Sequence, residues 1–143
     1  MRSLFKGLVV VCAASLLSGS ARGADIPNFN KRGSGEKEEK AFVGEVAKTI
    51  VHEARTSVGD VTLKEYKFNE EAKEGRMNLT LSAGYKGAVT KTGYTADIVV
   101  HLDTSTKDKW EVMRIEYKDD NKSPVGFSRK NVEALVSKFN AAK

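Results

Sequence analysis

Two stretches of this chain alternate strictly between apolar and polar residues, and the two patterns match each other. Apolar side chains occupy every second position in Arg76–Tyr85 and again in Tyr94–Asp103. This period of two is typical of strands with one buried face. If Tyr85 lies opposite Tyr94 in an antiparallel pair, apolar residues meet apolar residues along the whole ladder, which is how register is normally specified. The same register pairs Ala83 with Ala96, Leu81 with Ile98, Leu79 with Val100, Met77 with Leu102, Arg76 with Asp103 and Asn78 with His101.

Two further strands extend this hairpin into a four-stranded antiparallel meander. Val61–Phe68 is the first strand, and its apolar phase changes between Leu63 and Tyr66. The change predicts a β-bulge near Lys64–Glu65, because a bulge inserts one unpaired residue. Trp110–Tyr117 is the last strand. Extending the register to this strand places Ile98 opposite Ile115 and Val100 opposite Met113.

Helices flank the predicted sheet at both ends of the chain. Between Glu36 and about Thr56, apolar residues recur at steps of three and four, which indicates an amphipathic helix. A second helix begins after Ser128, a good N-cap residue, and has a similar apolar stripe. The order α-β-β-β-β-α predicts an α+β fold with both helices packed on one sheet face.

The first 23 residues have the layout of a secretory signal peptide. Arg2 and Lys6 precede the apolar run Gly7–Leu17, and Ala21-Arg22-Gly23 supplies the small residues of a cleavage site. The run is shorter than the about 20 residues that a membrane-spanning helix needs. We therefore expect an exported bacterial protein, periplasmic or secreted, without an integral membrane span. Its organisation would be a signal peptide over residues 1–23, a flexible leader over 24–35 and a single α+β domain over 36–143.

Removal of the signal peptide would change the chemistry of the chain. The lone cysteine, Cys12, lies within it, so the mature domain would have no thiol and no disulfide. Arg2, Lys6 and Arg22 account for three of the five net positive charges of the full chain. Because nucleic-acid binding needs a basic patch, we expect no nucleic-acid partner.

His101 is the one histidine that we consider as a catalytic or metal-binding residue. His101 shares the predicted outer face of its strand with Asp97 and Asp103, and a histidine beside carboxylates can support acid–base catalysis or bind a metal. Alternating polar residues are, however, what any solvated strand face shows. We therefore predict no catalytic residues, no metal site and no cofactor.

The predicted outer face also carries an apolar cluster. Val99, Trp110 and Val112 are expected close together on it, beside Arg114 and His101. Apolar and aromatic residues next to an arginine are typical of a protein contact surface. In the alternative, the sheet curls and the leader, a nearby turn or another subunit covers the cluster.

Three functions fit these features. The first is a non-enzymatic binding or interaction module of the bacterial envelope that uses the outer sheet face to contact an envelope or extracellular protein or a second copy of itself. The second is a small ligand-binding or hydrolytic α+β roll with a pocket between the helices and the sheet. The third is a self-assembling structural subunit that pairs through an exposed edge strand such as Val61–Phe68.

Overall fold

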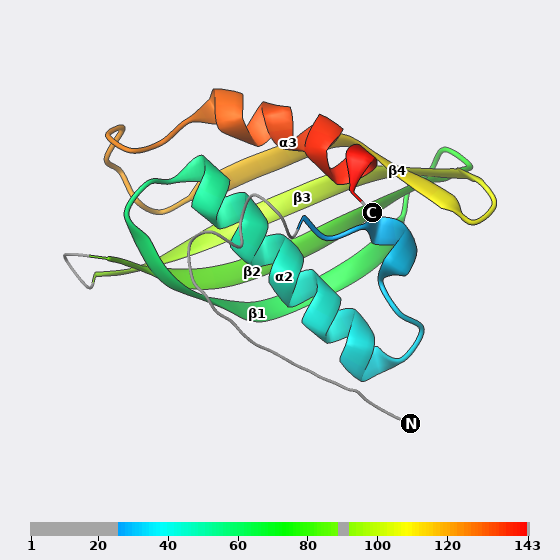
Figure 1. The fold of residues 1–143 in the computed structure, drawn as a ribbon, viewed down its shortest axis with the longest axis horizontal. Coiled ribbons are helices and arrows are strands. Elements are labelled where there is room, and N and C mark those ends of the chain that lie inside the picture. The colour runs from blue at the N-terminus through cyan, green and yellow to red at the C-terminus, as the bar shows by residue number, and fades with distance from the viewer. Residues whose placement is uncertain (1–25, 89–91, 143) are drawn as a thin grey trace.

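The computed structural model describes residues 26–88 and 92–142. Within these ranges the chain forms a short 3-10 helix, two α-helices and four strands (Figure 1). In chain order the elements are η1 (Phe29–Lys31), α2 (Glu36–Ala54), β1 (Val58–Glu70), β2 (Arg76–Gly87), β3 (Gly93–Thr106), β4 (Lys109–Asp119) and α3 (Arg129–Ala141).

The four strands form one antiparallel sheet in the order β1-β2-β3-β4. Both α-helices cover the same face of this sheet, with α2 packed against β1 and α3 against β4 (Figure 1). The predicted α+β class and element order are confirmed. We call the helix-covered side the inner face and the opposite side the outer face.

The central hairpin has the predicted register. Tyr85 pairs with Tyr94, and the ladder continues to Arg76 opposite Asp103 with no irregularity. The predicted bulge in β1 is also confirmed, because its register with β2 shifts between Leu63 and Glu65.

The predicted register between β3 and β4 is wrong by two residues. Val100 pairs with Ile115, not Met113, and Ile98 pairs with Tyr117. In addition, a one-residue bulge at Met113, between the pairs His101–Arg114 and Leu102–Val112, shifts the register once more and leaves Met113 47% exposed. Because a bulge changes the alternation of side chains along a strand, the residues of β4 before Met113 point to the faces opposite to those predicted. Trp110 and Val112 are therefore on the inner face.

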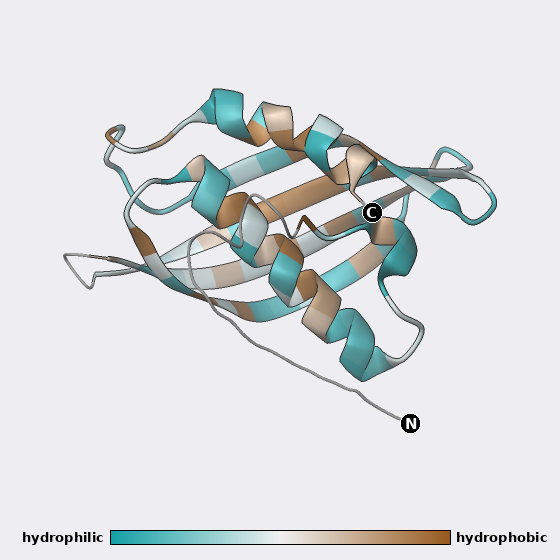
Figure 2. Cartoon of the chain, viewed as in Figure 1, coloured by the Kyte–Doolittle hydropathy of each residue, from teal (hydrophilic) through white to brown (hydrophobic). Residues whose placement is uncertain are grey.

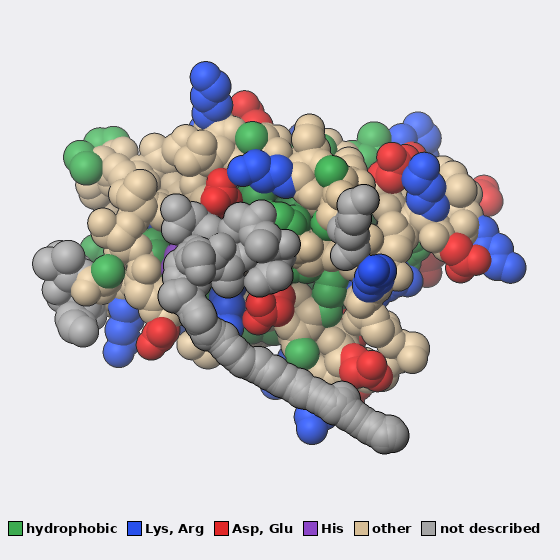
Figure 3. Space-filling view, in the orientation of Figure 1, with side chains coloured by type: hydrophobic (Ala, Val, Ile, Leu, Met, Phe, Trp, Pro, Cys, Tyr) green, Lys and Arg blue, Asp and Glu red, His purple; other side chains and the backbone are tan. Residues whose placement is uncertain are grey.

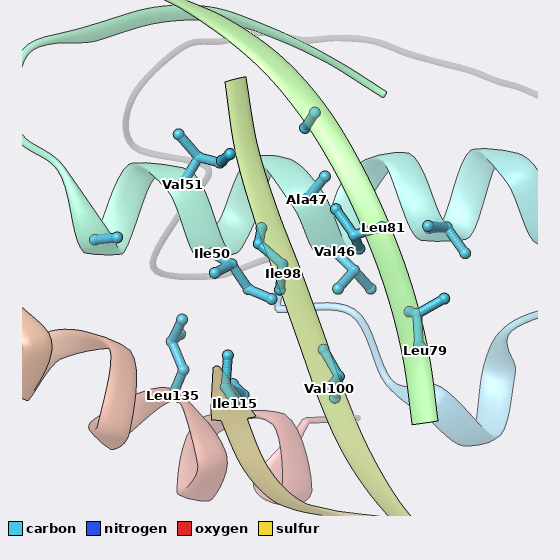
Figure 4. Packing of buried hydrophobic residues seen from close by; sticks show 14 of the residues in the cluster. Val46, Ala47, Ile50, Val51, Leu79, Leu81, Ile98, Val100, Ile115 and Leu135 are labelled. Carbon is cyan, nitrogen blue, oxygen red and sulfur yellow. The ribbon is translucent and has the colours of Figure 1, made fainter. Parts of the chain in front are cut away.

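The core lies between the helices and the inner sheet face. Apolar residues line the helix surfaces that face the sheet (Figure 2). In Figure 4, side chains from α2, β2, β3, β4 and α3 converge on one cluster. Its labelled members are Val46, Ala47, Ile50, Val51, Leu79, Leu81, Ile98, Val100, Ile115 and Leu135.

Within the predicted leader, residues 24–35, Asn28 and Phe29 are packed against the domain. Phe29 is 2% exposed and makes edge-to-face contacts with Phe42 and Phe139. Asn28 donates a side-chain hydrogen bond to the backbone of Ala142. Phe29 packs between the two helices, and burial of this aromatic group contributes about 1.5–3 kcal/mol toward the ordering of the segment.

A buried ion pair joins the end of α2 to the end of β4. The guanidinium of Arg55 contacts both carboxylate oxygens of Asp119, at 3.0 and 3.1 Å. It also donates to three carbonyls of the loop that leads to α3, those of Asn121, Ser123 and Val125. The Asp119 carboxylate additionally accepts hydrogen bonds from Tyr85 and Tyr117. Every charged group in this network therefore has partners, which a buried pair requires to be stable.

The predicted signal peptide, residues 1–23, lies outside the described residues. In the part of the chain that the structure describes, no helix has the length and apolar character needed to cross a membrane.

Candidate functional site

The structure separates the five residues that we expected to form one contact surface. Val99, His101 and Arg114 lie on the outer face, as predicted, with His101 paired opposite Arg114. Trp110 and Val112 lie on the inner face, and this part of the prediction is wrong. Val112 is 3% exposed and belongs to the core, whereas Trp110 is only partly buried. The bulge in β4 is the physical cause, since it changes the phase of the strand on its two sides.

On the outer face, His101 is the centre of a charged cluster. Its Nδ1 lies 3.1 Å from an oxygen of Glu71, and its Nε2 contacts both Glu116 and Arg114. The hydrogen bond with His101 is the main cause that lowers the pKa of Glu71 and of Glu116. These groups satisfy one another. Within the described residues, no three His, Cys, Asp or Glu side chains are arranged to hold a metal ion.

The inner face has a groove at the end of the sheet near Trp110. Its volume is about 550 Å³. The first turns of α2 extend past β1 at the edge of the sheet and form one wall (Figure 1). The lining residues are Arg32, Glu36, Glu39, Tyr66, Lys67, Phe68, Met77 and Trp110.

A row of aromatic rings forms the floor of this groove. The ring centroids of Tyr66 and Phe68 are 6.2 Å apart, and those of Phe68 and Trp110 are 6.1 Å apart, both in edge-to-face geometry. Phe68 comes from β1 and Trp110 from β4, the two opposite edge strands. The sheet must therefore curl strongly at this end, as in the alternative considered for the apolar cluster.

Two carboxylates lie above the aromatic row. Glu36 and Glu39 belong to the first turn of α2, where acidic residues also favour the helix dipole. Glu39 accepts a hydrogen bond of 2.9 Å from the hydroxyl of Tyr66. Burial and this bond raise the pKa of Tyr66, which keeps its hydroxyl protonated. Among the described residues, neither glutamate has a cationic group within 4.0 Å.

One cation of the chain itself occupies the aromatic surface. The guanidinium carbon of Arg32 lies 3.4 Å from the centroid of the Trp110 ring. Arg32 also donates to the carbonyl of Phe29. Burial lowers the pKa of Arg32, an effect that the charge of Glu39 partly opposes. The groove thus already accommodates a stacked guanidinium, a contact in which the ring attracts the cation electrostatically.

Comparison with known proteins finds no matching family model, no similar curated protein and no similar solved structure. The function must therefore be argued from the geometry of the groove.

The sequence predicts a contact surface that includes Trp110, but on the outer face, and it does not predict the residues that surround Trp110 in the groove. In the sequence, Glu36 and Glu39 are acidic residues at the start of a predicted helix, where such residues favour the helix dipole, and nothing else distinguishes them. Tyr66 and Phe68 were assigned to the first strand without a role. The phase change at the bulge of β1 was the available signal, because it turns both rings toward the helix-covered face.

Proposed function

We propose that this protein is an exported, non-enzymatic binding module whose binding site is the groove around Trp110. Its occupant would be a basic segment of an envelope or extracellular protein. One observation carries this proposal: Glu36 and Glu39, which have no cationic group within 4.0 Å among the described residues, line the groove together with the aromatic row of Tyr66, Phe68 and Trp110.

The lining favours a cationic occupant for two physical reasons. Aromatic faces attract ammonium and guanidinium groups, by about 0.5–1 kcal/mol at exposed sites and more where water is excluded. Carboxylates on the opposite wall add a Coulomb attraction. The stacking of Arg32 on Trp110 supplies an internal example of such a contact.

The lining also favours binding over catalysis. Its residues include neither histidine nor cysteine, and the only hydroxyl, that of Tyr66, has a raised pKa. A raised pKa makes a phenol less available as a nucleophile at neutral pH. A central pocket between helices and sheet has little room, since Leu79, Ile98 and Val100 fill that space.

Basic and acidic side chains are interspersed over the helix-bearing side of the molecule (Figure 3). A charged partner is therefore expected to recognise the local charges of the groove and not a field of one sign.

Calorimetric titration with a tetra-arginine peptide tests the proposal. The wild-type protein should bind this peptide, and a tetra-glutamate peptide should not bind. Replacing both groove carboxylates, Glu36→Gln with Glu39→Gln, should weaken binding about two- to thirtyfold, because exposed ion pairs contribute about 0.2–1 kcal/mol each.

A matched variant controls for net charge. Glu45→Gln with Glu133→Gln also removes two negative charges, from exposed positions on α2 and α3 outside the groove. This control should bind tetra-arginine with nearly wild-type affinity. Equal losses in the two double variants would show non-specific attraction and would contradict the proposal.

A further inference from the structure

We infer that the partner enters the groove as an extended strand that pairs with the free edge of β1. The inference rests on the proposed function and adds the conformation of the partner and the pattern of its side chains. It depends on the difference between the two edges of the sheet.

The free edge of β4 is capped by two asparagine side chains. Asn30 accepts from the backbone N–H of Trp110 at 2.7 Å and donates to its carbonyl at 3.3 Å. Likewise, Asn140 accepts from the backbone N–H of Val112 at 2.7 Å and donates to its carbonyl at 2.9 Å. A carboxamide that bonds both backbone groups of one residue replaces a neighbouring strand. This edge is therefore closed to a partner where the caps lie.

Among the described residues, none caps the free edge of β1 in this way. Between Glu65 and Glu70 the strand keeps a regular register with β2 on one side. On the other side, no described residue forms a hydrogen bond with its main chain. An edge of this kind presents unpaired N–H and C=O groups to which an incoming strand can bond.

The groove follows this edge. Three consecutive residues of β1, Tyr66, Lys67 and Phe68, line it. Because successive side chains of a strand point to opposite faces, a groove that touches all three must reach the main chain between them. A segment lying in the groove is thus beside the unpaired edge and under the first turn of α2.

The period of a strand defines the partner's sequence pattern. Alternate side chains of an added strand would point inward, toward Glu36, Glu39 and the aromatic row, where basic groups are favoured. The remaining side chains of the added strand would point to the outer face, beside Glu65 and Lys67. Small polar side chains suit this solvated face. The bulge between Leu63 and Glu65 interrupts the edge and limits pairing to about six residues.

Backbone methylation of a peptide tests this binding mode. The parent probe is acetyl-Thr-Arg-Thr-Arg-Thr-Arg-Thr-amide. Two derivatives carry N-methyl groups either on the backbone amides of the three arginines or on those of the three threonines that follow an arginine. In a strand only every second residue donates to its neighbour. We expect one derivative to lose about tenfold or more in affinity, since it loses three hydrogen bonds, and the other to bind within about threefold of the parent.

Amide exchange of the protein gives a second measurement on the same complex. Parent peptide should slow exchange of alternate amides in Glu65–Glu70 and leave those of Trp110 and Val112 unchanged. Equal affinities of all three peptides, equal losses in both derivatives, or unchanged exchange in β1 would overturn the inference. Binding of the parent with any of these results would leave the cation-binding groove intact. Failure of both tetra-arginine and the parent to bind would overturn the proposed function as well.

Discussion

Arg32 and Trp110 form the shortest cation–aromatic contact in the described part of the molecule, with 3.4 Å between the guanidinium carbon and the ring centroid. The contact joins the segment before α2 to the edge strand β4. It also covers a surface that, in our proposal, a partner's basic side chain would use.

Replacing Arg32 should therefore expose the groove. In Arg32→Ala, tryptophan emission should shift to longer wavelength, because Trp110 is the sole tryptophan and loses its cover. Tetra-arginine should bind a few-fold more tightly, since an internal competitor and its repulsion are removed. The free energy of unfolding should fall by about 0.5–1 kcal/mol.

Arg129→Ala is the matched control for this experiment. Arg129 lies 5.9 Å from the Phe127 ring, distant in sequence from the groove residues. Its removal should change neither the tryptophan emission nor the affinity. If Arg32→Ala weakened peptide binding, Arg32 would be a part of the site and not its internal occupant.

The Arg55–Asp119 pair should be the most sensitive polar contact in the fold. The two side chains are 6% and 3% exposed, so removing one leaves the other charged and buried. Arg55→Ala should lower the free energy of unfolding by about 3–5 kcal/mol. Urea denaturation followed by circular dichroism measures this, with Arg76→Ala as a control at the half-buried pair with Asp103. A loss below about 1 kcal/mol at Arg55 would contradict the structure.

The same pair predicts loss of stability in acid. Burial alone would raise the pKa of Asp119, but hydrogen bonds from Arg55, Tyr117 and Tyr85 outweigh it and lower the pKa below the ordinary 3.8. A carboxyl group with a lowered folded-state pKa stabilises the protein above its unfolded pKa. This contribution is lost as pH falls through the folded value.

We therefore expect the stability difference between the wild-type protein and Asp119→Asn to be constant above about pH 5 and to shrink below about pH 4. Chemical denaturation of both proteins between pH 2 and 7 provides the measurement. A difference that grew toward low pH would have the wrong sign for this network.

Much of the fold could be predicted from the sequence, and the failures have a common physical origin. The register of β2 with β3 was predictable because alternation in Arg76–Tyr85 is uninterrupted. The orientation of Trp110 was not, because it depends on a bulge. The bulge leaves the apolar Met113 exposed, and an apolar residue at that place gives no sign of the change in phase.

Polar contacts between residues far apart in the chain could not be predicted from the sequence either. Arg55 and Asp119 are ordinary charges in a chain of which 30% is charged. Only the closure of the loop after β4 reveals that they meet. Phe29 was assigned to a leader for a similar reason, since the composition of residues 24–35 is polar and its packing partners lie on two distant helices.

The caps of β4 give a prediction that is independent of the groove. Asn140→Ala removes both side-chain hydrogen bonds to the main chain of Val112. We expect a loss of about 1–2 kcal/mol and faster exchange of the Val112 amide. Asn131→Ala, an exposed change on the same helix, should alter neither. Unchanged exchange at Val112 in Asn140→Ala would show that the cap is not formed in solution.

Titration of Trp110 fluorescence with tetra-arginine tests the central claim most directly, because the only tryptophan of the chain lines the proposed site. We predict a saturable change in emission, with an affinity that Glu36→Gln with Glu39→Gln lowers and that Glu45→Gln with Glu133→Gln leaves unchanged. Emission that stays constant while the peptide binds, or that changes equally in both double variants, would place the binding site elsewhere and contradict the account.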